Sequence, residues 1–320
     1  MKILDTVRQQ AKMVAENAHF VQIHYDKIDA YANSLPLEDI DAPPLDPECH
    51  YIQHDEYTLL YFLTLEGINF GSGYFPHLTH KVAGSGYFTV AKAWKKYFEK
   101  PDKVTARTLA KLTTEDCMAI FGQSNHNPPI VELMSLFATA LNQIGTLLIE
   151  KYDGQVGNLF QAADHSAEQL VLLLIQLPCF QDFATYGTEK IPILKRAQIT
   201  AADISLAFNN QGLGHFKDLD QLTIFADNMV PHVLRCDGII SYAPALTIKI
   251  DAHTLIPASS KEEVEIRTCA IHAVELMRAV LVAKGHPINS IDLDYLLWNR
   301  GQAPFYETTF PIHLTRTIFY

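Results

Sequence analysis

The stretch 218–238, DLDQLTIFADNMVPHVLRCDG, holds a carboxylate in otherwise apolar surroundings. Its spacing predicts a helix with two apolar stripes, so that the helix should be largely buried. Asp227 lies between the stripes, where it must be paired, hydrogen-bonded or used in chemistry, because an isolated buried charge is unfavourable. Asp218 can cap this helix, and Pro231 should kink it and free carbonyl groups near Asp227. Asp227 is therefore a candidate catalytic residue, and a structural carboxylate paired with an arginine is the alternative.

Two further stretches carry candidate binding residues. In IDLDYLLWNRGQ, Asp294, Trp298 and Asn299 occupy positions i, i+4 and i+5, which share one helical face. An aromatic ring beside a carboxylate and an amide can stack on a nucleobase and hydrogen-bond to its edge. The alternative places Trp298 in the core, with Asp294 as its solvated neighbour. In KRAQITAADISLAF, Lys195 and Arg196 precede an apolar helix, where they could bind a phosphate group or simply be solvated.

The histidine pairs lack the pattern of a metal centre. His50 and His54 are four residues apart, and His77 and His80 are three apart. Zinc hydrolases use HExxH on a helix, or clusters with carboxylates at defined spacing. Neither pair has a glutamate at the required position, so we expect ordinary loop or partly buried histidines. The sequence predicts no metal ion and no cofactor, and it contains neither a G-x-S-x-G elbow nor a Walker loop.

The elements expected to position these residues are mainly helices. Periodic apolar residues predict helices over 3–34, 91–100 and 129–152. Capping boxes that start at Ser166 and Ser260 open two more, and the second should end near Gly285. The aromatic and apolar runs 57–65 and 68–74 predict strands of a hairpin. We therefore expect a mainly α fold (α+β, with a small β-hairpin near the N-terminus). It should form one domain, 1–320, in which 1–104 mixes helix and strand and 105–320 is mainly helical and catalytic.

Composition limits the function classes. The 320 residues carry 25 Lys and Arg against 36 Asp and Glu, and this net charge of −11 disfavours direct binding to nucleic acid. The longest apolar run, 170–175, is far shorter than the ~20 residues of a membrane-spanning helix. Five widely spaced cysteines without a CxxC motif fit a reducing compartment. We expect a soluble, cytoplasmic protein without a membrane partner, and leave the oligomeric state open.

Several of these stretches, taken together, resemble one known family. The chain is similar to the queuosine salvage protein family, whose members are queuosine 5′-phosphate N-glycosylase/hydrolases. The similarity is strong from about residue 125 onward and thinner before it. The segments that carry it are KRAQI (195–199), FKDLDQLTIFADNMVPHVL (216–234), EVEIRTCAIHAVELMR (263–278), INSIDLDYLLW (288–298), TRTIFY at the end, and, at the front, INF (68–70), SGYF (85–88) and His50 after DPEC.

The resemblance implies a function and a set of roles. The function would be hydrolysis of the N-glycosidic bond of queuosine 5′-monophosphate, which releases queuine and ribose 5-phosphate. The queuine would then be salvaged into tRNA. The fold would be helical, with a DNA-glycosylase-like architecture. Asp227 would be the catalytic carboxylate. Many relatives carry Asp where this chain has Asn299, so that one charge facing the base is lost. The residues that would contact the queuine base are His50, Phe225, Asp294, Trp298 and Asn299.

The implied chemistry suits these residue types. Transfer of a ribosyl group passes through an oxocarbenium-like state, which a fixed carboxylate stabilises or attacks covalently. Phe225 and Trp298 are placed to sandwich the flat base, and Lys195 or Arg196 is expected at the 5′-phosphate. Two alternatives are a glycosylase for another modified purine nucleotide and a module that binds queuine or its nucleotide without cleaving it. A helical adaptor for another protein is a third.

Overall fold

The computed structural model describes residues 2–41, 45–82 and 84–320. Within them the chain is mainly helical, as the sequence predicts, and it has four short strands. It forms two compact units, and each unit is assembled from segments that are distant in the sequence. Unit 1 consists of Met1–Pro44, Asp182–Lys195 and Asp220–Arg316, and unit 2 of Leu45–Gln181, Arg196–Leu219 and Thr317–Tyr320.

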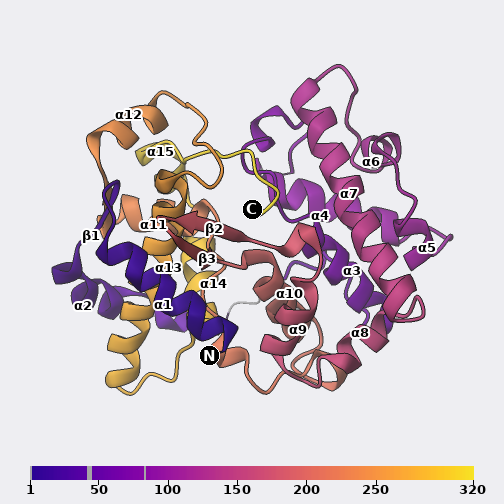
Figure 1. The fold of residues 1–320 in the computed structure, drawn as a ribbon, viewed down its shortest axis with the longest axis horizontal. Helices are drawn as coiled ribbons and strands as arrows, with labels where there is room; N and C mark the ends of the chain where they lie inside the picture. Colours follow the sequence, from indigo (N-terminus) through magenta and orange to yellow (C-terminus); the bar gives the residue numbers. More distant parts are fainter. Residues whose placement is uncertain (1, 42–44, 83) are drawn as a thin grey trace. The chain divides into compact units, whose positions relative to one another are not determined.

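Unit 1 is built around one long helix, α13. Figure 1 shows α1 lying along α13, and α2, α11 and α14 also pack against it. Ser260 caps α13 by accepting a hydrogen bond from the Glu263 N–H at 3.3 Å, and the helix ends beside Gly285 at φ +91°. Both predicted ends of this helix are confirmed. The helices of unit 1 are α1 (Ile3–Glu16), α2 (Tyr25–Ser34), the 3₁₀ turn η1 (Leu37–Asp41), α11 (Met229–Cys236), α12 (Pro244–Asp251), α13 (Lys261–Ala283), α14 (Ser290–Arg300) and α15 (Pro304–Thr309).

The strands of unit 1 form two antiparallel pairs. β1 (Val21–Ile23) pairs with β4 (Ile240–Tyr242), with Gln22 opposite Ser241. β2 (Phe183–Tyr186) and β3 (Glu189–Pro192) form a hairpin. The β2–β3 hairpin leads directly into Lys195, so it sets the position of that residue.

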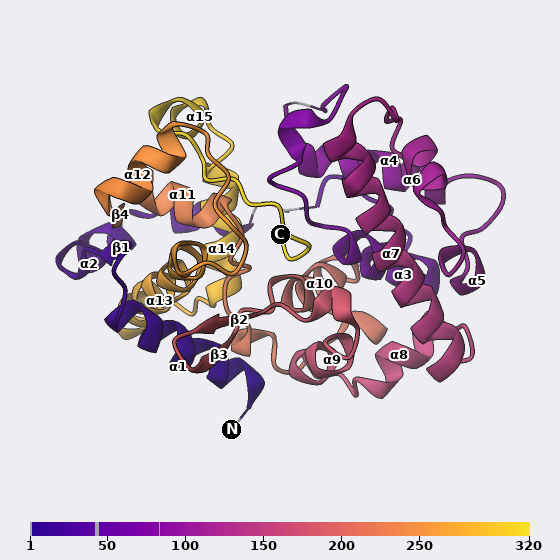
Figure 2. The same cartoon turned by 45° about the horizontal axis from the view of Figure 1, so that its top comes forward.

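Unit 2 is also built around one long helix, α7, against which α3, α5 and α6 pack (Figure 2). Among the described residues, α7 has the length and the apolar composition that could cross a membrane. Of its most apolar 18-residue stretch, 56% is buried within the protein. These contacts and this burial are those of a core helix. The helices of unit 2 are α3 (Glu56–Gly67), α4 (Gly86–Phe98), α5 (Ala106–Leu109), α6 (Thr114–Ile120), α7 (Pro128–Lys151), α8 (Val156–Ala162), α9 (Ala167–Leu174), α10 (Lys195–Ala207) and the 3₁₀ turns η2 (Phe75–His77), η3 (Pro178–Phe180) and η4 (Gly212–Gly214).

A close approach between α7 and α5 predicts a stability effect at Gly145. A Cβ atom at Gly145 would lie 2.5 Å from the backbone nitrogen of Ala110 and 2.6 Å from the backbone oxygen of Ala106. Gly145→Ala should therefore lower the free energy of unfolding by about 1–3 kcal/mol, although alanine is the better helix former. Urea denaturation measures the change, with Ser135→Ala on the exposed side of α7 as control. An unchanged or higher stability of Gly145→Ala would contradict this packing.

Two predictions about the front of the chain are wrong. The runs 57–65 and 68–74 do not form a hairpin, because residues 56–67 are helix α3. This helix is buried on all sides, so its sequence shows no helical period, and its aromatic content is typical of strands. The cap was the overlooked signal, since the Asp55 carboxylate accepts a hydrogen bond from the Thr58 N–H at 2.8 Å. The predicted helix over 3–34 is interrupted by β1, which separates α1 from α2.

The two units do not follow the division expected at residue 104. Each draws on segments from both sides of that point, because β1 pairs with β4 over more than two hundred residues. That the whole chain acts as one glycosylase domain, with a DNA-glycosylase-like architecture, stays a prediction.

Candidate active site

Asp227 lies at the start of a helix rather than inside one. The chain makes a short 3₁₀ turn at Leu219–Gln221, continues without regular structure through residue 226, and enters α11 only at Met229. The predicted helix over 218–238 is therefore wrong, and so is the kink, because Pro231 is the third residue of α11 and its missing N–H is not needed there. Asp218 does not cap this segment. Its carboxylate accepts hydrogen bonds from Ser166 Oγ and the Ala167 N–H at 2.7 and 2.6 Å, at the start of α9.

The Asp227 carboxylate is fixed by the helix that follows. Its Oδ1 accepts hydrogen bonds from the backbone N–H groups of Met229 and Val230, at 2.7 and 3.4 Å. The N-terminus of a helix carries partial positive charge, which favours an anion at this position. The Asp227 side chain is half-buried. The result is a carboxylate with a fixed orientation and some access to solvent.

Two side chains hold the backbone immediately before Asp227. The Asp294 carboxylate, on α14, accepts a hydrogen bond from the Phe225 N–H at 2.8 Å. The Arg267 guanidinium, on α13, donates from Nε to the Ala226 carbonyl oxygen at 2.8 Å. Residues 225–227 are therefore held from two helices, although they lie in no regular element themselves.

The two carboxyl groups differ in their electrostatic surroundings. Burial raises the pKa of Asp227, and it is opposed by Lys195, by the two N–H groups of α11 and by Arg267. Burial and the charge of Asp227 together raise the pKa of Asp294 to about 8, against the Phe225 N–H and Lys195. More groups favour the anion at Asp227, whereas Asp294 is mostly protonated at neutral pH. Neighbouring carboxyls whose surroundings differ in this way can serve different roles.

The three predicted base-binding residues all lie on helix α14, and they differ in exposure. Asp294 is buried, Trp298 is half-buried and Asn299 is exposed. Phe225 is only 2% exposed, and its ring meets that of Tyr295 edge to face at 5.9 Å. A sandwich of a base between Phe225 and Trp298 stays a prediction, and it requires the Phe225 ring to become accessible.

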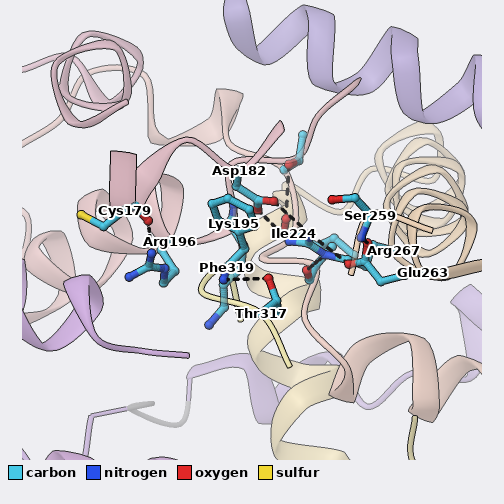
Figure 3. Close-up of polar contacts among 12 residues, drawn as sticks. Cys179, Asp182, Lys195, Arg196, Ile224, Ser259, Glu263, Arg267, Thr317 and Phe319 are labelled. Atoms are coloured by element: carbon cyan, nitrogen blue, oxygen red, sulfur yellow. Dashed lines mark hydrogen bonds and ion pairs between the residues drawn. The ribbon is translucent and has the colours of Figure 1, made fainter. Parts of the chain in front are cut away.

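Lys195 and Arg196 are neighbours in sequence but belong to different units. The Lys195 side chain is 3% exposed and acts electrostatically on both Asp227 and Asp294. The Arg196 guanidinium donates to the carbonyl oxygens of Gly67 and Cys179, and the contact with Cys179 is visible in Figure 3. These backbone contacts, with the Phe180 ring 5.2 Å away, give Arg196 a structural role in unit 2. Of the two predicted phosphate ligands, only Lys195 shares a unit with Asp227.

Comparisons with known proteins assign the chain to a family. A sequence profile described as queuosine salvage protein matches residues 49–320. The chain belongs to this family. It is 36% identical, over 99% of its own length and 97% of the relative's, to the queuosine 5′-phosphate N-glycosylase/hydrolase of Sphaerobacter thermophilus. Proteins with the same name from Dictyostelium discoideum and Bos taurus are 34% and 32% identical, over 83% and 74% of this chain and 79% and 72% of their own lengths.

His50, which the family resemblance places at the base, lies in unit 2. Its Nδ1 is 2.9 Å from the Asp46 carbonyl oxygen and its Nε2 is 2.9 Å from the Tyr87 hydroxyl oxygen. The ring also stacks on Phe62, with 6.0 Å between ring centroids. Burial lowers the pKa of His50, so the ring is neutral at physiological pH. Its contact with the base stays a prediction.

Sequence reasoning missed the group of charges behind the candidate site. Arg267, Asp182 and Glu263 are each no more than 3% exposed, and the guanidinium bonds to both carboxylates. Glu263 and Arg267 are four residues apart on α13, which is a spacing that could have indicated a pair. Asp182 and Arg267 are 85 residues apart, and no local pattern indicates their contact.

A separate hollow of about 550 Å³ opens on unit 2, within the described part of the chain. His54, Phe208 and Gln211 are among the residues that line it. Its lining includes none of the residues predicted for catalysis or binding. It therefore adds nothing to the candidate site.

Proposed function

We propose that this chain is an N-glycosyl hydrolase that cleaves queuosine 5′-monophosphate into queuine and ribose 5-phosphate. The observation that carries the proposal is the orientation of Asp227. Its carboxylate is held by two N–H groups at the start of α11, and a second carboxyl, Asp294, holds the backbone before it. The names of the relatives, all queuosine 5′-phosphate N-glycosylase/hydrolases, supply the substrate.

Asp227 acts on the charge that develops during cleavage. As the bond between C1′ and N9 breaks, its electron pair moves to N9 and the ribosyl ring becomes oxocarbenium-like. A negative charge already in place beneath the ring stabilises this state without reorganisation. The hydroxyl group of a water molecule adds to C1′, and that water releases its other proton. The departing base takes up one proton, so no net proton is gained or lost.

The base needs help to leave, because queuine is a 7-deazaguanine and has no N7 to protonate. Asp294, mostly protonated at neutral pH, can donate a hydrogen bond to the base edge. Trp298 and Asn299 lie on the same helix and offer a stacking surface and an amide. In this proposal α14 binds the base, and the N-terminus of α11 holds the catalytic carboxylate of Asp227, which precedes it.

Lys195 is the candidate for the 5′-phosphate, since it is a cation in the same unit as Asp227. Its ammonium charge also favours the ionised form of Asp227. The reaction as proposed uses no metal ion and no cofactor. The queuine released would be available for insertion into tRNA, and a cytoplasmic location agrees with five cysteines that are all described and all free.

The test is an incubation of the purified chain, with a chelator present, with queuosine 5′-monophosphate, queuosine or guanosine 5′-monophosphate. Queuine, guanine and ribose 5-phosphate are quantified by chromatography and mass spectrometry. We expect queuine and ribose 5-phosphate in equal amounts from queuosine 5′-monophosphate. Release of guanine alone would favour a glycosylase for another purine nucleotide. Tight binding without release would favour a binding module.

A further inference from the structure

We infer that Arg267 and Asp182 are positioning residues, a buried ion pair that holds Asp227 and Lys195 in the arrangement that cleavage requires. The inference rests on the proposed function. It concerns residues that touch the backbone of the catalytic segments rather than the substrate. Neither residue is among those predicted from the sequence.

The Arg267 guanidinium forms hydrogen bonds through both its Nη atoms and its Nε atom. It is 2% exposed, and Nη1 and Nη2 donate to Oδ1 and Oδ2 of Asp182 at 2.9 and 2.7 Å. This is the two-bond geometry that fixes a guanidinium in one plane. A third nitrogen, Nε, donates to the Ala226 carbonyl oxygen at 2.8 Å. A shift of the ion pair would therefore move the peptide that carries Asp227.

Asp182 also holds the backbone that leads into Lys195. Its Oδ2 also accepts a hydrogen bond from the Lys195 N–H at 3.1 Å, and its carbonyl oxygen accepts from the N–H groups of Ile193 and Leu194 at 3.0 and 3.3 Å. Leu194 is held at φ +60°, a left-handed conformation that a leucine rarely adopts. The bonds to Asp182 compensate for this strain and hold the residues that lead into Lys195.

Glu263 supports the guanidinium from its own helix. Its Oε1 lies 3.3 Å from Arg267 Nη1, and its Oε2 accepts a hydrogen bond from the Ser259 N–H at 3.1 Å. Figure 3 shows the Asp182 and Glu263 carboxylates both pointing toward Arg267. The ion pair is thus anchored to α13, the central helix of unit 1.

Stability alone does not account for this arrangement. A buried ion pair often contributes no more to stability than apolar residues of similar volume, because its charges must be desolvated. Apolar residues cannot donate to the Ala226 carbonyl oxygen as Arg267 does, or accept from the Lys195 N–H as Asp182 does. The polar groups are required for orientation, and orientation is what the candidate site needs.

The first test compares Arg267→Lys and Asp182→Asn with wild type in queuine release from queuosine 5′-monophosphate. We expect kcat to fall by about 100-fold in each variant, because a misplacement of 1 Å can have that effect, with KM nearly unchanged. Arg278→Lys is the matched control on the same helix, since Arg278 is partly exposed and lies 3.6 Å from Glu275. Its kcat should equal that of wild type.

A second variant separates orientation from folding. The apolar variant, Asp182→Leu/Glu263→Gln/Arg267→Met, replaces the ion pair with apolar side chains of similar volume, and its neutral glutamine avoids an unpaired charge at Glu263. We expect it to melt cooperatively near the wild-type temperature and to have the same loss of kcat.

The pH profile adds a readout that a merely structural pair would not move. The groups that interact electrostatically with Asp227 are the cations Lys195 and Arg267 and the titratable carboxyl of Asp294. Loss of Arg267 should therefore move the acidic limb of kcat in the apolar variant to higher pH. Wild-type kcat in the variants that fold would overturn the inference and leave the proposed function intact. An inactive wild type would overturn both.

Discussion

Asp227→Asn is expected to reduce the turnover of queuosine 5′-monophosphate by about a thousandfold or more while leaving the fold intact. Asparagine keeps an oxygen at the position of Oδ1, so it can still accept hydrogen bonds from the Met229 and Val230 N–H groups. What the variant loses is the negative charge. That charge is what the proposed mechanism requires in the transition state, whereas binding of the substrate depends on other groups.

The measurement is kcat from single-turnover and steady-state release of queuine, together with the melting temperature and the affinity for queuosine 5′-monophosphate. Asp251→Asn is the matched control, because Asp251 also lies in unit 1 and its carboxylate is 48% exposed beside Arg235 at 3.6 Å. We expect turnover in the control to equal that of wild type. Normal turnover in a well-folded Asp227→Asn protein would contradict the catalytic role.

Local signals were sufficient for much of the fold. Ser166 and Ser260 cap their helices as predicted, because a hydroxyl that accepts a backbone N–H is a local event. The helical face of Asp294, Trp298 and Asn299 follows from spacing alone. Helix α3 was misread because a helix buried on every side has no amphipathic period, and only its cap distinguishes it from a strand.

The sequence around Asp227 is compatible with two interpretations, one long helix or a helix that begins after Asp227. Its apolar residues fit a helical period over 218–238, yet the helix begins only at Met229. The Asp-Asn pair followed by Pro231 is itself a signal for the start of a helix, since proline is tolerated in the first turn. The sequence predicts a role for this carboxylate, which stays a prediction, and the orientation of the carboxylate comes from a helix N-terminus rather than from a kink.

The support of the site could not be predicted from local patterns. Asp182 lies between η3 and β2, and Arg267 lies in the N-terminal third of α13. Their pairing depends on how distant parts of unit 1 meet. A buried arginine in an apolar helix indicates only that some carboxylate must compensate it. Which carboxylate does so is a property of the tertiary fold.

Asp294→Asn is expected to make the protein more stable at pH 8 than wild type. Burial and the charge of Asp227 raise the pKa of Asp294 to about 8, whereas the ordinary pKa of an aspartate is 3.8. Between these two values the folded state holds a proton that the unfolded state has released, so the stability of wild type falls as pH rises. Asparagine cannot ionise, and its side-chain oxygen can still accept the Phe225 N–H.

The difference in the free energy of unfolding between Asp294→Asn and wild type should grow by about 2–4 kcal/mol from pH 5 to pH 8, and level off above that range. Urea denaturation at a series of pH values measures it. Asp227→Asn provides the internal check. Removing the charge of Asp227 should lower the pKa of Asp294, so that the pH-dependent fall in stability levels off at a lower pH than in wild type. A difference that does not change with pH would mean that Asp294 is already ionised at pH 5. The hydrogen bond to the base would then have to come from another group on α14.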